Sequence, residues 1–216
     1  MIDPGLPASY RTFVEKIMPM IPAHRIISDA LRTLAYGTDA SFYRLIPKVV
    51  VKTETETEIA FLLRQASQLN LPVTFRAAGT SLSGQAISDS ILCVAQNGWK
   101  SWEILENGAK IKLQPGVIGG KANACLAGYG KKIGPDPASI NSAMIGGIAA
   151  NNASGMCCGT SQNSYQSLDS IRIVFADGTV LDTADESSRQ AFSKTHAAML
   201  ADIGALRDRV LDDAAL

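Results

Sequence analysis

Histidine and cysteine are scarce in this chain, and a long apolar run is missing altogether. The 216 residues include two histidines and four cysteines. Neither His24 nor His196 lies near a cysteine in the sequence, and no Cys-x-x-Cys pair occurs, so we expect no metal site. We expect the four thiols to be reduced and buried. No stretch approaches the roughly 20 apolar residues that a membrane-spanning helix needs.

An excess of either charge is also missing. Lysine and arginine number 20, and aspartate and glutamate also number 20. This balance gives no electrostatic reason to expect nucleic acid or an acidic membrane as a partner. Residues 1–16 contain acidic residues and prolines where a signal peptide has a basic and then an apolar region. We therefore expect a cytoplasmic protein with no transmembrane segment.

A strand–helix–strand pattern is present and ends at a glycine-rich turn. Residues 49–51 are all valine and predict a buried strand. Thr55 and Glu58 fit a capping box at the start of an apolar-faced helix, which Pro72 ends. Residues 73–76 then predict the next strand. This order is typical of an α/β domain with parallel strands.

The remaining pattern predicts three regions in sequence. We expect a helical lead-in over residues 1–45, in which Ile27, Leu31 and Leu34 have helical spacing. A first unit follows at 46–96 and a second at 97–216. The further predicted elements are a strand at 91–95, a hairpin at 102–113 with a two-residue Asn107-Gly108 turn, a helix at 118–126, a hairpin at 171–181 and a helix behind Thr195.

Residues 76–85, with the sequence R-A-A-G-T-S-L-S-G-Q, carry the first chemical signal. Small residues let backbone N–H groups converge on an anion, and hydroxyl side chains add donors. The glycine spacing resembles a triphosphate loop, but Gln85 and Ala86 stand where that loop needs lysine and then serine or threonine. We therefore predict a phosphate group of some other ligand, with an ordinary surface turn as the alternative. A Rossmann glycine motif is absent from the sequence.

Residues 135–159 carry the second signal, being rich in glycine, alanine and serine. A helix of glycine and alanine is intrinsically weak, and it makes sense where a flat, wide ligand lies against its backbone. Asn151, Asn152 and Ser154 could bond the polar edge of a ring system or a pyrophosphate. The alternative is tight helix packing through small residues. Both segments together favour a large dinucleotide ligand.

These two segments, with YGTDASFYRLIPKVVV before them and SIRIVFADGTVLDT after them, resemble a known family. It is the FAD-binding, p-cresol methylhydroxylase-type domain of the vanillyl-alcohol oxidase superfamily. Within it the chain is most similar to the FAD- and iron–sulfur-containing D-lactate dehydrogenases and to glycolate oxidase, over residues 36–183. The resemblance implies an α+β fold of two small α/β subdomains with FAD between them.

The resemblance also implies which residues contact FAD. The first loop would wrap the pyrophosphate with backbone amides, and Arg76 is the least certain member because it could instead close the strand. The flavin should be non-covalent, since the first loop lacks the histidine of covalently flavinylated relatives. The implied cofactor-binding residues are Arg76, Ala78, Gly79, Thr80, Ser81, Leu82, Gly84, Gln85, Pro135, Asp136, Ser139, Gly146, Gly147, Asn152, Ser154, Gly155, Gly159 and Ile173.

The chain departs from the family by stopping at Leu216, before the strand and substrate domain that relatives carry. We expect a C-terminally truncated, N-terminal portion of a flavin-dependent D-2-hydroxy acid dehydrogenase, with D-lactate the favoured substrate. Glycolate and D-2-hydroxyglutarate oxidation, and a non-catalytic flavin- or nucleotide-binding module, are the alternatives. No catalytic residue is assigned, so the piece alone should be inactive. An iron–sulfur cluster, if any, would lie in the missing part. The electron acceptor is unknown, and attachment to the inner membrane face is an option for the parent enzyme only.

Overall fold

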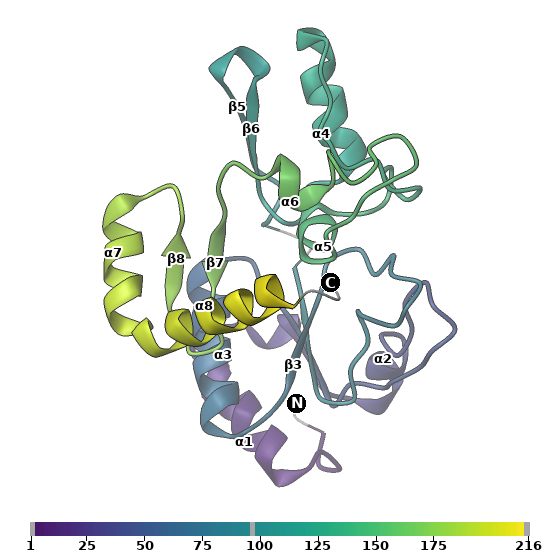
Figure 1. Ribbon diagram of the computed structural model, residues 1–216. Coiled ribbons are helices and arrows are strands. Elements are labelled where there is room, and N and C mark those ends of the chain that lie inside the picture. The colour runs from purple at the N-terminus through teal and green to yellow at the C-terminus, as the bar shows by residue number, and fades with distance from the viewer. Residues whose placement is uncertain (1–2, 96–97, 214–216) are drawn as a thin grey trace.

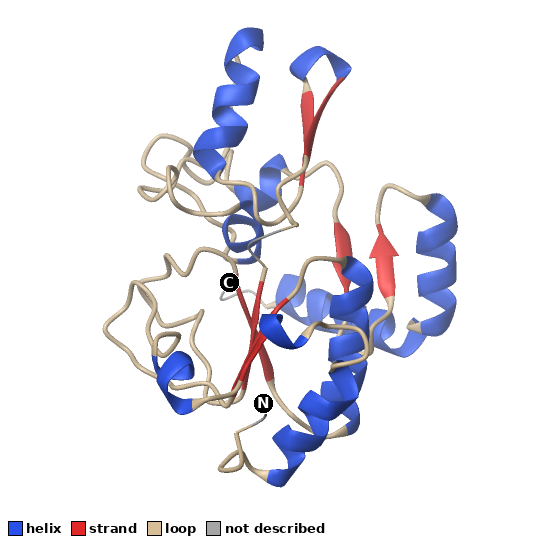
Figure 2. Ribbon diagram, turned by 180° about the vertical axis from the view of Figure 1, so that it is seen from behind, coloured by secondary structure: helices blue, strands red, loops and turns tan. Residues whose placement is uncertain are grey.

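A computed structural model describes residues 3–95 and 98–213 (Figures 1 and 2). The expected boundary between Gln96 and Asn97 lies outside these residues. One half of the structure contains a four-stranded sheet with helices beside it. The other half, residues 98–213, contains two separate hairpins and further helices; one hairpin lies at the far end of the molecule, and the other lies beside the four-stranded half. The glycine-rich segments lie where these two halves adjoin.

The four-stranded sheet has the order β1-β2-β4-β3. Its strands are β1 (Ile26–Ile27), β2 (Val49–Lys52), β3 (Val73–Arg76) and β4 (Ile91–Val94). Strands β2 and β3 each pair in parallel with β4, and β1 pairs antiparallel with β2. Helix α3 (Glu56–Gln68) connects β2 to β3. The predicted strand–helix–strand unit is therefore confirmed, and β3 delivers the glycine-rich loop to the carboxyl edge of the sheet.

The central strands are apolar along their whole length because both of their faces are covered. On one face, α1 (Ala8–Ile17) and α3 pack together over the sheet, where Phe13, Ile17, Leu62 and Ile91 are fully buried. On the other face, buried valine and leucine side chains of β2 and β4 pack against Tyr36. Burial on this scale stabilises the fold by roughly 25 cal/mol per Å² of apolar surface.

The prediction of a helix through Ile27 is wrong. Ile26 and Ile27 form β1 and pair with Val51 and Val50, which buries both isoleucines against the sheet. Helix α2 begins only at Ala30 and ends at Leu34, and Leu31 on it is 79% exposed. Strand pairing outweighed the helical spacing because it buries more apolar surface.

A buried ion pair ties the lead-in to α3. Arg25 donates to both carboxylate oxygens of Glu58, at 2.6 and 3.0 Å. The predicted cap is confirmed in part, because Thr55 Oγ1 accepts from Glu58 N at 3.2 Å. The Glu58 carboxylate, however, accepts from Glu54 N at 2.8 Å and from Arg25 rather than from Thr55 N. Glu58, in the first turn of α3, therefore also anchors the segment that precedes the sheet.

The second half begins with the hairpin of β5 (Trp102–Leu105) and β6 (Lys110–Leu113), which projects from one end together with α4 (Gly119–Leu126) (Figure 1). The hairpin was predicted, but its two-residue turn was not correct. Leu105 pairs with Lys110, so residues 106–109 form the connection. Glu106 and Asn107 both have positive φ there, at 51° and 53°. The ring of Tyr129 packs against Gly108, which favours this wider loop.

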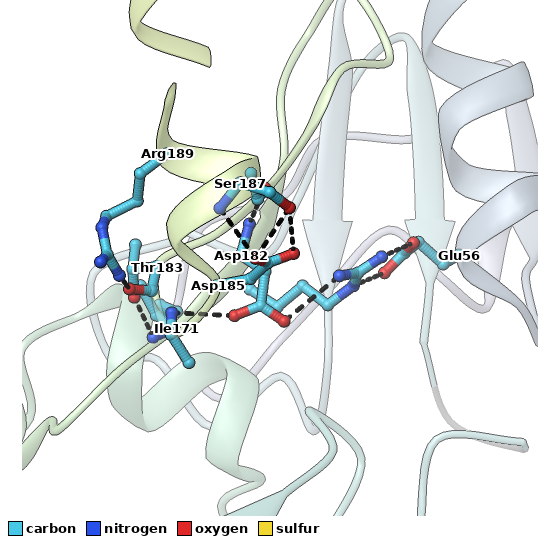
Figure 3. A network of polar contacts seen from close by, with 10 residues as sticks. Glu56, Ile171, Asp182, Thr183, Asp185, Ser187 and Arg189 are labelled. Carbon is cyan, nitrogen blue, oxygen red and sulfur yellow. Dashed lines mark hydrogen bonds and ion pairs between the residues drawn. The ribbon is translucent and has the colours of Figure 1, made fainter. Parts of the chain in front are cut away.

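The second hairpin, β7 (Arg172–Val174) and β8 (Val180–Asp182), packs on α3 of the first half. Arg172 donates to both carboxylate oxygens of Glu56 on α3, at 2.6 and 2.8 Å, and to Asp182 at 3.2 Å (Figure 3). Helix α7 (Glu186–Thr195), which packs on β8, was not predicted. The remaining elements are α5 (Ile145–Ala150), α6 (Ser164–Ser167), α8 (Ala197–Asp212), η1 (Ala23–Arg25), η2 (Glu106–Gly108) and η3 (Ala127–Tyr129).

The four thiols are free, but they are not all buried as expected. Cys93 and Cys158 are buried, Cys125 is half-buried and Cys157 is exposed. Burial raises the pKa of the Cys93 thiol to about 12, so this thiol stays protonated.

Among the described residues, no group of three or more His, Cys, Asp and Glu side chains could hold a metal ion. Nor does any helix in the described ranges have the length and apolar character to cross a membrane.

Candidate functional site

Arg76, the last residue of β3, fixes the base of the first glycine-rich loop. Its side chain is buried, and its Nε donates to the carbonyl oxygen of Ala86 at 2.7 Å. Its Nη2 donates to the carbonyl oxygen of Tyr36 at 3.0 Å. Burial is the main influence on this guanidinium and lowers its pKa. Arg76 thus positions the two ends of the loop, with donors already directed at backbone carbonyls.

Asp39, which the sequence analysis did not single out, holds the same loop from outside. One carboxylate oxygen accepts from Ala86 N at 3.3 Å and the other from Ser41 N at 2.9 Å. Next to it, Ala40 N donates to the carbonyl oxygen of Gly79 at 2.9 Å. Burial alone would raise the pKa of Asp39, but the hydrogen bonds from Ser41 and Ala86 outweigh burial, so the net effect is a lowered pKa. The only signal for Asp39 was its position in the YGTDASFYR segment.

Two glycines shape the loop itself. Gly79 and Gly84 have φ values of +71° and +70°, a conformation that glycine adopts without strain. A Cβ atom on Gly84 would lie 2.9 Å from the ring of Tyr43, so the aromatic ring packs directly on the glycine backbone. At Gly79 the nearest atoms would be 3.6 Å away. The loop is therefore supported by Tyr43 at Gly84, whereas Arg76 and Asp39 lie in ordinary van der Waals contact with the Cβ position of Gly79.

The second glycine-rich segment is folded on itself. Asp136 N donates to the carbonyl oxygen of Ser154 at 3.1 Å, and a Cβ atom on Gly155 would lie 1.8 Å from Asp136 O. Asn152 has φ of +43°, and its side-chain oxygen accepts from Tyr165 N at 3.0 Å. These contacts require a glycine at position 155 and occupy the Asn152 oxygen internally.

Helix α5 in this segment is partly packed and partly bare. A Cβ atom on Gly146 would meet Pro115 at 2.7 Å, so this glycine packs closely against the turn after β6 rather than against another helix. At Gly147 and Gly159, in contrast, no atom lies within 4 Å of a Cβ position. The segment thus offers exposed backbone at two glycines, as a flat ligand resting on it requires.

The two segments meet through their side chains. Gln85 Nε2 donates to Asn151 Oδ1 at 3.0 Å, across 66 positions of sequence. The structure therefore joins the first loop to the second segment at this contact, through the predicted residue Gln85 and its neighbour Asn151. Ile173 lies elsewhere, in β7, paired with Leu181. The first-loop members are Ala78, Gly79, Thr80, Ser81, Leu82, Gly84 and Gln85, and the second-segment members are Pro135, Asp136, Ser139, Gly146, Gly147, Asn152, Ser154, Gly155 and Gly159.

This arrangement fits a long anionic dinucleotide. The first loop contains hydroxyl and amide side chains and is joined through Gln85 to the second segment, where the backbone is bare at Gly147 and Gly159. Ligands of open α/β sheets bind beyond the carboxyl ends of the parallel strands, which is where the first loop lies. Neither segment contains a histidine, and the exposed thiol of Cys157 stands in the second.

Comparison with known proteins agrees with this geometry. The family described as FAD binding domain matches residues 47–184, more than half of the chain. Glycolate oxidase subunit GlcD of Escherichia coli (strain K12) is 29% identical over 83% of this chain and 37% of its own length. D-2-hydroxyglutarate dehydrogenase of Pantoea ananatis is 26% identical over 83% of this chain and 18% of its own. D-lactate dehydrogenase of Archaeoglobus fulgidus is 26% identical over 66% and 32%. The chain thus spans at most 37% of the length of these relatives.

Solved structures share the fold. An alkyldihydroxyacetonephosphate synthase superposes with a TM-score of 0.70 at 18% identity, covering 84% of this chain and 36% of that one. p-Cresol methylhydroxylase with substrate bound superposes with a TM-score of 0.68 at 13% identity, covering 84% and 37%. The predicted p-cresol methylhydroxylase-type fold is confirmed.

Proposed function

The chain belongs to the FAD binding domain family, and from that premise we propose that it forms the FAD-binding portion of a flavin-dependent D-2-hydroxy acid dehydrogenase. D-Lactate is the substrate we favour. Relatives named glycolate oxidase and D-2-hydroxyglutarate dehydrogenase support the hydroxy-acid class and keep those two acids as alternatives. The observation that carries the proposal is the contact of Gln85 with Asn151, which joins the glycine-rich loop after β3 to the segment whose backbone is bare at Gly147.

The residues divide the binding of FAD between the two segments. We assign the pyrophosphate to the backbone amides of residues 78–85 other than Ser83, whose N–H donates to Ser81 Oγ, because the positive φ values of the glycines at positions 79 and 84 turn the chain so that amides can converge on an anion. We assign the flavin ring to the bare backbone around Gly147 and the edge of the second segment. The backbone at Ile173 would contact the adenine end. Arg76 and Asp39 act behind the loop, where they hold its ends in place.

The chemistry supplied by bound FAD is acceptance of the hydride that leaves the substrate C2, while the hydroxyl proton passes to a base, so that a 2-hydroxy acid becomes a 2-oxo acid. The residues described above bind and orient the cofactor for that step. The first loop would hold the negatively charged diphosphate through backbone amides rather than through a cation, since the guanidinium of Arg76 is directed at carbonyl groups.

Non-covalent binding is the first expected result. Purified protein titrated with FAD should turn yellow and quench the flavin fluorescence, and acid precipitation should leave the yellow colour in the supernatant. The physical reason is that neither glycine-rich segment offers a histidine for attachment. Colour that stays with the precipitated protein would contradict non-covalent binding. Protein that remains colourless after titration with FAD would contradict the proposed function.

The second expected result is that residues 1–216, loaded with FAD, turn over no D-2-hydroxy acid. Hydride transfer needs a base for the hydroxyl proton and a cation for the carboxylate, both held beside the flavin. His196 is occupied at the other hairpin, where Nε2 lies 3.0 Å from Asp177 and the ring stacks on Phe192. Dye reduction with D-lactate, D-2-hydroxyglutarate or glycolate should stay at the level without substrate. Saturable reduction with one of them would show that the catalytic groups lie within this chain.

A further inference from the structure

We propose that Ser81, Gln85 and Asn151 form a latch that holds the two glycine-rich segments together over the bound cofactor and slows its release. The latch is the chain of hydrogen bonds from Ser81 through Gln85 to Asn151. It rests on the proposed function for its ligand. Its geometry, however, is a property of the protein alone.

Ser81 sets the orientation of the glutamine. Its Oγ accepts from Ser83 N at 3.1 Å and donates to Gln85 Oε1 at 2.8 Å. A hydroxyl has a single hydrogen to donate, so this one is already committed to the glutamine rather than to a phosphate. The oxygen of the Gln85 amide is therefore turned toward Ser81. Its nitrogen points out of the loop.

Asn151 presents the matching acceptor from the other half. Gln85 Nε2 donates to Asn151 Oδ1 at 3.0 Å. Asn151 is the residue that ends α5, and its backbone N–H donates to Gly147 O at 3.1 Å, which fixes its place beside the bare glycine. Both amide side chains are exposed, so this contact forms and breaks in solvent. A latch must be able to open and close, whereas a hydrogen bond that only stabilises the fold need not.

The position of the contact between Gln85 and Asn151 allows it to restrain the separation of the two glycine-rich segments. Among the hydrogen bonds between described residues, it is the one that joins residues 77–90 to residues 134–163. The halves are also joined away from these segments, for example by Trp99 Nε1 donating to Thr53 O at 2.8 Å and by Arg172 on Glu56. Breaking the latch therefore lets the segments separate while the two halves stay attached. A ligand lying between the segments would leave through that opening.

The first test follows FAD release by stopped-flow fluorescence in the wild type, Gln85→Ala, Asn151→Ala and the double variant. A single hydrogen bond of ordinary strength predicts release about two- to tenfold faster in each single variant. Because the two residues act through one bond, the double variant should release FAD no faster than the single ones. Gln190→Ala is the matched control, since it removes an exposed glutamine bond to Glu186 within α7. It should release FAD at the wild-type rate.

Several outcomes would overturn the latch. If the two single effects multiply in the double variant, the residues act independently. If only Gln85→Ala has an effect, the glutamine contacts the cofactor directly and Asn151 has no part in it. Unchanged or slower release in both single variants would mean that the contact does not restrain the ligand.

A second measurement needs no cofactor and separates the latch from the proposed function. In the unliganded protein, Asn151→Ala should increase the amide hydrogen exchange of residues 79–85, although it lies 66 positions from Gln85. Gln190→Ala should leave that exchange unchanged. Unaltered exchange in Asn151→Ala would overturn the latch even if FAD binds. Increased exchange in a protein that binds no FAD would support the latch and reject the proposed function.

Discussion

Gly79→Val is expected to abolish FAD retention while the protein stays folded. Gly79 has φ of +71°, and a β-branched residue held there is strained by about 1–3 kcal/mol. The valine Cβ would have room, with Arg76 Cδ at 3.6 Å and Asp39 Cβ at 3.8 Å, but its methyl groups would crowd the two side chains that hold the loop. The loop would move and its amides would no longer converge on the pyrophosphate. Flavin absorbance after gel filtration, together with an FAD titration, measures this loss.

Gly130→Val is the matched control for this variant. Gly130 also has positive φ, at +65°, and no atom lies within 4 Å of its Cβ position. It ends η3 and belongs to neither glycine-rich segment. The control should therefore carry a similar backbone strain and still retain FAD. Wild-type FAD affinity in a Gly79→Val protein with a native circular dichroism spectrum would show that this loop is not the phosphate site.

Glu58→Ala is expected to lower the free energy of unfolding by about 3 kcal/mol or more, because it leaves the buried guanidinium of Arg25 without its main partner. Glu58 and Arg25 are only 7% and 9% exposed. The change would also release Glu54 N, which donates to the same carboxylate. Urea denaturation followed by circular dichroism measures the difference. A loss below about 1 kcal/mol would contradict a buried, mutually dependent pair.

Glu54→Ala is the control, since Glu54 also lies 3.2 Å from Arg25 but its side chain is 43% exposed. It should lower the free energy of unfolding by about 1 kcal/mol or less.

The effect of Glu58→Ala should also depend on pH. Burial raises the pKa of Glu58, but hydrogen bonds from Arg25 and from Glu54 N outweigh it, so the pKa is lowered. A lowered pKa means that the stabilisation is complete above the unfolded value, about 4.3, and is lost as the pH falls below it. The free energies of unfolding of the wild type and of Glu58→Ala should therefore become more alike in acid.

Local sequence signals predicted the parts of this fold whose structure depends on neighbours in the chain. The valine run at 49–51 and the capped helix after Thr55 are present as expected. The same holds for the hairpins around residues 102–113 and 171–181. In each case, an apolar period or a cap within a few residues decides the conformation. The glycines of the first loop belong to the same class, because positive φ favours glycine whatever lies around it.

Signals of that kind failed where a distant segment decides the outcome. Ile27 has helical spacing with Leu31 and Leu34, yet pairing with Val50 makes it a strand. The four-residue turn at 106–109 follows from the ring of Tyr129 packed on Gly108, about twenty positions away. Helix α7 contains two apolar residues, Ala191 and Phe192, and Phe192 is its buried residue, packed against Phe175 of the hairpin.

The same division applies to the candidate site. The sequence by itself determined where the two glycine-rich segments lie and predicted that they bind the cofactor, since residue type alone decides where a backbone can be left bare. Only the tertiary structure decided how those segments are held. Arg76 is directed at carbonyl groups, Asp39 supports the loop from a segment about forty residues earlier, and Asn151 meets Gln85 across the junction. The physical reason is that a side chain forms a hydrogen bond with whichever polar group the folded chain places within about 3 Å of it. Residues far apart in the sequence have no spacing pattern that predicts such a contact.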